Sequence, residues 1–241
     1  MLSTIIKAEN LKLKKNPVWI AFLILPSLSA LIGTLNFTNN QGILSNTWYS
    51  LWSQHTLFLC YFFLPTLIGT YCAYLWRMEH FNRNMNFYMT LPVSRSYLLL
   101  GKLITSAKMA FLSIAWIFLL FVLCGKLAGI TEPLPIVLIE WFFCGLLGSL
   151  SICSLQLFLS QVIPIFSIPI GISLLGGILG LLLTTKGYAL YCPYALLAYG
   201  MRANKPGMKI ELLPFIVSCL LFTAIFLLLS LYQLLHRDVN A

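Results

Sequence analysis

The stretch that organises the chain is residues 77–102, which read RMEHFNRNMNFYMTLPVSRSYLLLGK. It is a long polar and basic stretch between two strongly apolar segments, residues 56–76 before it and residues 103–124 after it. Each flanking segment has about the 20 apolar residues that a helix needs to cross some 30 Å of hydrocarbon. The stretch is therefore expected to be a loop outside a membrane that joins two spanning helices.

This loop has a helical pattern of its own. Apolar residues recur in it at spacings of three and four, with polar residues between them, which predicts an amphipathic helix over residues 77–91. Pro92 would end that helix, because proline lacks a backbone donor and clashes inside a helix. Ser94 can then cap the helix that restarts at Arg95. A surface loop that only satisfies topology is the simpler alternative. The apolar stripe consists of Met78, Phe81, Met85 and Tyr88.

The composition indicates an all-α integral membrane protein. Of the 241 residues, 60% are hydrophobic and 9% are charged, and the mean hydropathy is +0.91. A soluble domain carries about 25% charged residues, so this chain could not cover a water-exposed surface. The apolar runs are nearly continuous, whereas the strands of a membrane barrel alternate. We expect one transmembrane domain, residues 1–241, with six spans at about 17–35, 56–76, 103–124, 136–160, 166–183 and 213–235.

The N-terminus, residues 1–16, is expected to lie along the membrane surface. It contains four lysines and one glutamate, and its rough apolar face is interrupted by Glu9. Such a helix would place its apolar side among the headgroups and its lysines near anionic lipid. In the third span, Lys108 is close enough to the start to reach the interface with its long side chain. A buried charge is the alternative for Lys108.

The distribution of charge predicts the orientation. The net charge is +9, which in a membrane protein reflects the positive-inside bias and not nucleic-acid binding. The N-terminus and the 77–102 loop are basic, whereas residues 36–55 carry no charge and hold three interfacial-type aromatics. Both termini and the 77–102 loop are therefore expected in the cytoplasm, with residues 36–55 as an outer loop.

The outer loop at residues 184–212 departs from this charge pattern. Either charges late in the sequence have little influence on the membrane orientation, or this surface meets anionic lipid or an amphiphilic ligand. Within it, residues 188–200 hold four tyrosines and could be interfacial or re-entrant. Glu140 lies one turn inside the fourth span, where an ionisable group is a functional candidate, although it could also reach water. The candidate cargo or lipid contacts are Glu140, Lys186, Arg202, Lys205 and Lys209.

No catalytic chemistry is evident. The chain lacks the P-loop pattern for ATP and the common hydrolase and metalloprotease motifs. The three histidines are scattered, the six acidic residues form no pair in sequence, and the seven cysteines form no C-x-x-C. No catalytic residue, metal site or cofactor is therefore expected in this chain.

Two motifs resemble a known family. The N-terminus has an A-E-x-x-K-L-K-K-type pattern (Ala8, Glu9 and Leu11 to Lys15), and the 77–102 loop ends in T-L-P-V-S-R followed by L-G-K. Together with the span layout, these resemble the permease subunits of ABC-2-type exporters. The nearer resemblance is to the small permeases of lantibiotic-immunity and bacitracin-resistance transporters of Gram-positive bacteria. The glutamate expected early in the loop is Glu79, and the Gly-Thr that often follows it is replaced by His80-Phe81-Asn82.

The resemblance implies a mechanism in which residues 77–91 form a coupling helix that docks on a separate ATPase subunit. The implied coupling residues are Met78, Glu79, Phe81, Arg83, Met85, Tyr88, Pro92, Ser94 and Arg95. The ATPase would bind ATP and magnesium, and a second permease subunit, identical or related, would complete the transporter in a bacterial plasma membrane. The implied cargo is an amphiphile such as a lantibiotic peptide, expelled for self-protection. The alternatives are another cargo (a drug, sodium or a lipid), or a membrane sensor or assembly factor without transport activity.

Overall fold

The computed structural model describes residues 2–14, 17–81 and 93–236, and these residues form helices and no strands. Six helices are long and apolar enough to cross a membrane, as the sequence predicts. They are α2 (Ala21–Asn39), a continuous helix over Trp48–His80, α6 (Arg95–Leu127), α7 (Val137–Val162), α8 (Ser167–Thr185) and α10 (Leu212–His236). The shorter helices are α1 (Leu2–Lys14), η1 (Pro17–Ile20), η4 (Ala189–Tyr191) and α9 (Pro193–Gly200).

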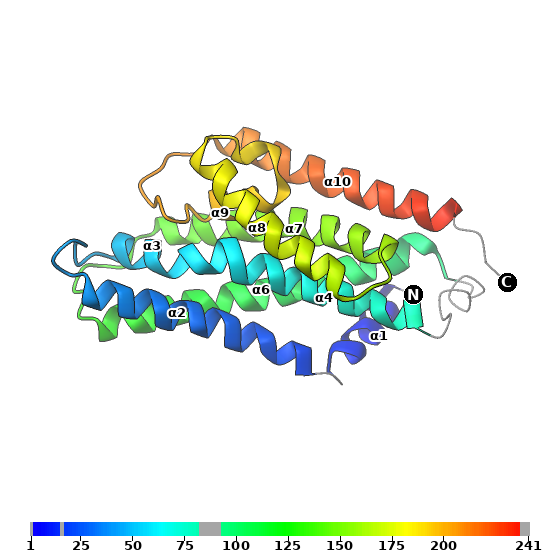
Figure 1. The fold of residues 1–241 in the computed structure, drawn as a ribbon, viewed down its shortest axis with the longest axis horizontal. Helices are drawn as coiled ribbons and strands as arrows, with labels where there is room; N and C mark the ends of the chain where they lie inside the picture. Colours follow the sequence, from blue (N-terminus) through cyan, green and yellow to red (C-terminus); the bar gives the residue numbers. More distant parts are fainter. Residues whose placement is uncertain (1, 15–16, 82–92, 237–241) are drawn as a thin grey trace.

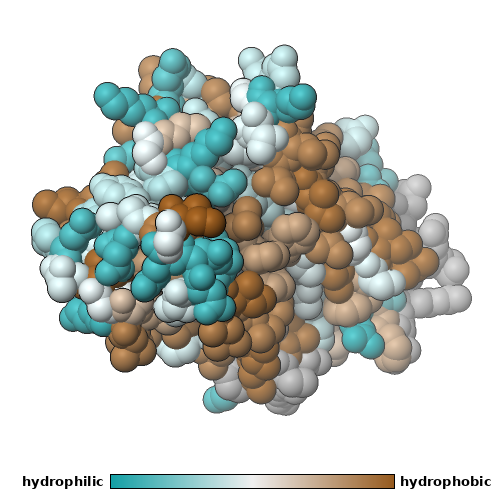
Figure 2. Space-filling model, turned by 60° about the vertical axis from the view of Figure 1, so that its left-hand side comes forward, coloured by the Kyte–Doolittle hydropathy of each residue, from teal (hydrophilic) through white to brown (hydrophobic). Residues whose placement is uncertain are grey.

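The spanning helices run along the long axis of the molecule and form an elongated bundle (Figure 1). At one end lie α1 and the C-terminal end of α10, and at the other end lie α9 and the loops that precede α3 and α10. Hydrophilic residues gather on the loop-bearing end, and hydrophobic residues cover the flank behind it (Figure 2). This division is typical of a bundle whose sides face lipid and whose ends face water.

The second span begins earlier than expected, and the predicted outer loop over residues 36–55 is wrong at both ends. Helix α2 continues to Asn39, and α3 (Trp48–Phe58) begins after Thr47, whose hydroxyl accepts a hydrogen bond from Ser50 N. Trp48 and Trp52 are buried inside the bundle. Their indole N–H groups donate to the carbonyls of Glu132 and Met201, and the donor–acceptor distance is 2.8 Å in both hydrogen bonds. A buried indole is stable where its N–H has such a partner.

A π-helical turn, η2 (Leu59–Phe63), joins α3 to α4 (Leu64–His80). Pro65 follows it, and proline has no N–H to donate to the carbonyl of Tyr61 four residues earlier. That carbonyl faces Gly177 of α8, where any Cβ atom would overlap it. The absence of a side chain at Gly177 thus lets α8 approach the irregular turn closely.

Helix α9, which is the C-terminal part of the stretch over residues 188–200, lies inside the bundle. All but one of its residues are buried, and it packs against α7 and α8. A Cβ at Gly148 would lie 2.8 Å from the backbone of Leu197, and one at Gly180 would lie 3.0 Å from the carbonyl of Tyr194. These two glycines, one on each spanning helix, therefore leave room for a short buried helix.

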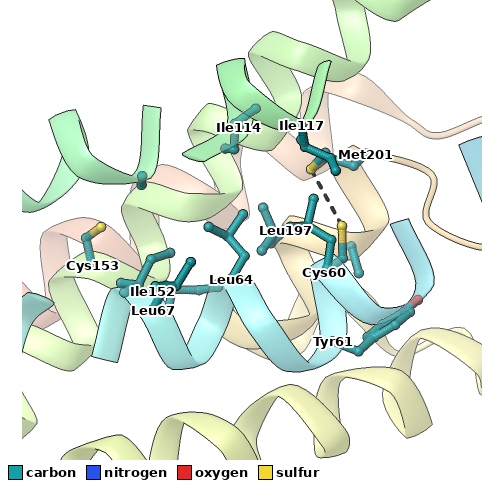
Figure 3. Packing of buried hydrophobic residues seen from close by; sticks show 14 of the residues in the cluster. Cys60, Tyr61, Leu64, Leu67, Ile114, Ile117, Ile152, Cys153, Leu197 and Met201 are labelled. Carbon is teal, nitrogen blue, oxygen red and sulfur yellow. Dashed lines mark hydrogen bonds between the residues drawn. The ribbon is translucent and has the colours of Figure 1, made fainter. Parts of the chain in front are cut away.

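The core beside α9 is apolar and contains sulfur atoms. Leu197 and Met201 lie near Ile114 and Ile117 of α6, and the thiol of Cys60 donates to Met201 Sδ over 3.6 Å (Figure 3). All seven cysteines are free, and six are buried. They act as small packing residues.

Candidate functional site

Four charged side chains from three helices meet at the α1 end of the bundle. They are Glu9 and Lys12 of α1, Glu79 of α4 and Lys102 of α6. Lys102 Nζ lies 2.6 Å from Glu79 Oε1 and 3.2 Å from Glu9 Oε1. Lys12 Nζ lies 2.6 Å from the same Glu79 oxygen and 2.7 Å from Glu9 Oε1. We call these four residues the charge cluster. Its two acids and two bases sum to zero charge.

The charge cluster is almost completely removed from solvent. Glu79 and Lys102 are 0% exposed, and Glu9 is 2% exposed. Lys102 Nζ also donates to the carbonyl of Leu75, at a distance of 2.7 Å, and lies 4.7 Å from the ring centroid of Trp76. Burial by itself lowers the pKa of Lys12, but the charges of Glu79 and Glu9 raise it well above its ordinary value. Lys12 is therefore a cation at neutral pH.

The charge cluster closes the base of the connection between α4 and α6. Glu79 lies in the last turn of α4, and Lys102 lies in the second turn of α6. Their ion pair holds the end of α4 against the start of α6, and Glu9 and Lys12 connect α1 to the same cluster. The fit of α1 on α6 is close, because a Cβ at Gly101 would lie 2.6 Å from Ile5 Cγ2.

Such a cluster specifies an arrangement more than it adds stability. The cost of removing charges from water offsets most of the attraction between them, whereas removal of one partner leaves a buried charge unpaired. Buried ionisable groups with specific charged partners are also candidates for a functional site. The charge cluster is therefore the strongest candidate for a functional element among the described residues.

The sequence alone predicts other roles for these residues. Glu79 is expected to contact an ATPase and Lys102 to belong to an exposed basic loop. Glu9 is expected to be an interruption of a lipid-facing stripe. In the structure, the side chain of Lys102 is buried and paired with those of Glu9 and Glu79, which are also buried. A usable signal was present: each acid lies within an apolar face of its own helix, where an unpaired charge would be costly.

The described part of the predicted coupling element also differs from expectation. Residues 77–80 extend α4 and do not begin a separate helix. Met78 is 44% exposed and Phe81 is 63% exposed at this end of α4. The remaining predicted residues, Arg83, Met85, Tyr88 and Pro92, lie outside the described residues, as does most of the predicted helix.

The return of this connection is fixed by Ser94 and Arg95. Ser94 occupies the N-cap position of α6, and its carbonyl accepts hydrogen bonds from the N–H groups of Tyr97 and Leu98. Its side chain makes no capping bond. Arg95 Nη1 donates to the carbonyl of Leu235 over 3.0 Å and so joins the start of α6 to the end of α10.

A second candidate site lies at the opposite end of the bundle. Glu140 Oε1 lies 2.5 Å from Arg202 Nη2, and Arg202 Nη1 donates to the carbonyl of Gly200 over 2.9 Å. Arg202 is buried and has a left-handed backbone with φ of +48°. It is therefore not the free surface cation that the sequence suggested. Lys186, Lys205 and Lys209 are exposed.

This ion pair borders a cavity of about 650 Å³. The cavity is lined by Tyr49, Trp141 and the chain before α10, including Lys209 and Ile210. An apolar pocket with a few charged groups is the usual composition of a small-molecule site. In the described part of the chain, no three residues of the metal-ligating types lie close enough together to hold a metal ion.

The fold thus defines a polytopic helical membrane protein with a buried charge cluster at one end and a cavity at the other. A sequence model of a protein family, described as "ABC-2 family transporter protein", matches residues 5–180. The chain belongs to this family and is a membrane subunit of an ABC transporter. Membership implies a separate ABC ATPase partner. No curated protein matches the chain.

Proposed function

We propose that the chain is the permease subunit of an ATP-driven exporter in a bacterial plasma membrane. Its cargo would be a lantibiotic or a similar amphiphilic antimicrobial peptide, expelled for self-protection. The observation that carries the proposal is family membership over residues 5–180, together with the sequence motifs at the N-terminus and in the 77–102 loop. ATP and magnesium would bind to the partner ATPase, and a second permease subunit, identical or related, would complete the transporter.

The proposed coupling element is the connection between α4 and α6. Phe81 is well exposed at the end of α4, and an aromatic side chain is a common anchor of protein interfaces. Glu79, two residues earlier, is held in the charge cluster. Movement of the connection would therefore be passed directly to α1 and α6. In this proposal Glu79 positions the coupling element and does not touch the ATPase.

The proposed cargo contacts are at the other end of the bundle. Exposed Lys186, Lys205 and Lys209 give this surface a positive charge, and the adjoining cavity offers aromatic walls and the Glu140 carboxylate. An amphiphilic peptide presents apolar and charged groups together, so its chemistry fits such a surface. The buried Arg202 would hold the cavity in shape.

The proposal is tested by co-expression of the tagged chain with an ABC ATPase encoded beside it in the same genome. We expect the two to co-purify, and cells that carry both to survive higher concentrations of an amphiphilic antimicrobial peptide. A catalytically inactive ATPase should co-purify but give no resistance. If no ATPase binds and resistance still appears, the chain is not a permease driven by ATP. If the ATPase binds without resistance, the cargo assignment is wrong.

A further inference from the structure

The membrane boundary on α6 can be placed from its charges. Lys108 and Lys126 are both exposed, and the residues between them carry no charge. At 1.5 Å per residue, the 18 steps from Lys108 to Lys126 cover about 27 Å, close to the thickness of a hydrocarbon core. Lys108 therefore lies at the level where hydrocarbon meets headgroups, on the same end of the bundle as α1.

A groove of about 410 Å³ opens at this level between α1, α2 and α6. Its polar lining consists of Asn10, Lys14 and Lys108, and its apolar lining includes Phe22 and Leu112. Phe22 lies in the first turn of α2, a helix of 19 residues without charge. The first turn of α2 and Lys108 thus mark the same boundary, with basic groups on the headgroup side and apolar groups on the hydrocarbon side.

The two lysines of the groove lack acidic partners. No carboxylate of the described residues lies within 4.0 Å of either amine, and Lys108 Nζ donates to the neutral amide oxygen of Asn10. The two acids on the neighbouring helices, Glu9 and Glu79, are already paired within the charge cluster. The groove therefore carries two positive charges that no carboxylate among the described residues neutralises.

We propose that this groove binds an anionic phospholipid of the leaflet in which α1 lies. The lipid phosphate would accept hydrogen bonds from Lys14 and Lys108, and one acyl chain would lie on Phe22 and Leu112. Basic pockets between membrane helices recognise anionic headgroups in this way. Because α1 and α6 also meet in the charge cluster, the lipid would add a second attachment of α1 to the bundle, at the groove. The site depends on the fold alone and not on the partner ATPase.

Native mass spectrometry of the purified chain tests the site. The probes are phosphatidylglycerol and phosphatidylcholine with identical acyl chains. We expect the wild-type chain to retain phosphatidylglycerol preferentially. A basic residue near an anionic lipid surface strengthens binding about fivefold, so Lys14→Gln combined with Lys108→Gln should weaken phosphatidylglycerol binding by about thirtyfold. Both side chains are exposed, so the unfolding temperature should change little.

A matched control keeps the total charge change equal. Lys7→Gln combined with Lys126→Gln removes two exposed lysines that do not line the groove and should leave phosphatidylglycerol retention unchanged. Glycerol 3-phosphate, which offers the phosphate without acyl chains, should not displace the lipid. The proposal is overturned if phosphatidylcholine binds as well as phosphatidylglycerol, if both double variants lose the lipid equally, or if glycerol 3-phosphate displaces it.

Discussion

Lys102 of α6 and Glu79 of α4 form an ion pair with an N–O distance of 2.6 Å, and neither side chain is exposed. The two residues are 23 positions apart, one near the end of α4 and the other near the start of α6. A direct contact between the end of α4 and the start of α6 limits how far one helix can move without the other.

Replacement of Lys102 by methionine should destabilise the fold. The change keeps the apolar length of the side chain but leaves Glu79 and Glu9 with Lys12 as their one remaining partner in the charge cluster. Loss of one partner from a buried charge pair costs about 3–5 kcal/mol, which thermal unfolding in detergent should detect. Lys126→Met, at an exposed position on the same helix, should have little effect. The double variant Glu79→Gln with Lys102→Met should lose less than the sum of the two single changes; a strictly additive loss would argue against direct coupling.

Replacement of Phe81 by alanine should weaken binding of the partner ATPase and leave the chain in the membrane. Truncation of a central aromatic anchor costs about 2 kcal/mol, or about thirtyfold in affinity. The dissociation constant of the purified complex is the measurement. Ile43→Ala removes an exposed apolar side chain at the other end and serves as the control. Equal affinity for Phe81→Ala and wild type would reject this anchor.

Replacement of Gly148 by alanine should destabilise the packing of α9. The added Cβ would lie 2.8 Å from backbone atoms of Leu197, and a backbone cannot move aside as a flexible side chain can. Overpacking of this kind costs about 1–3 kcal/mol. Gly171→Ala is the matched control, since nothing lies within 4 Å of its new Cβ. If both variants unfold at the same temperature, α9 does not pack as described.

Single cysteines at Asn46 and Lys205 should react with a membrane-impermeant reagent added to intact cells, whereas one at Lys7 should react only after the cells are opened. The reason is the basic character of the N-terminus and the 77–102 loop, which favours a cytoplasmic position. Asn46 and Lys205 lie in the loops before α3 and α10, at the opposite end of the bundle from α1. Labelling of Lys7→Cys in intact cells would reverse the orientation.

Replacement of Lys186, Lys205 and Lys209 together by glutamine should reduce resistance to an amphiphilic peptide and leave assembly with the ATPase intact. All three side chains are exposed, so their loss removes surface charge without leaving an unpaired buried group. Minimum inhibitory concentrations and complex yields are the measurements. Lys7→Gln, at the other end of the bundle, controls for the loss of surface charge in general. Unchanged resistance would mean that these lysines face only lipid or water.

The sequence by itself determined the membrane class and the six spans. Both follow from local physics, because about 20 consecutive apolar residues are stable as a helix in lipid whatever surrounds them. The same reasoning placed a helix at the N-terminus and a restart at Ser94 and Arg95. These features depend on residues that are close together in the sequence, so the sequence alone is enough to predict them.

The tertiary structure alone decided which polar residues face each other. Glu9, Glu79 and Lys102 come from three helices. The apolar surroundings of each acid can be read from the sequence, but the partner of each acid cannot. The burial of Trp52 could not be read from the sequence either, because its hydrogen-bond partner is the carbonyl of Met201, 149 residues later. Helix α9 is buried because glycines on α7 and α8 leave room for its backbone. Contacts between distant segments, and with them the charge cluster, exist only once the helices have packed.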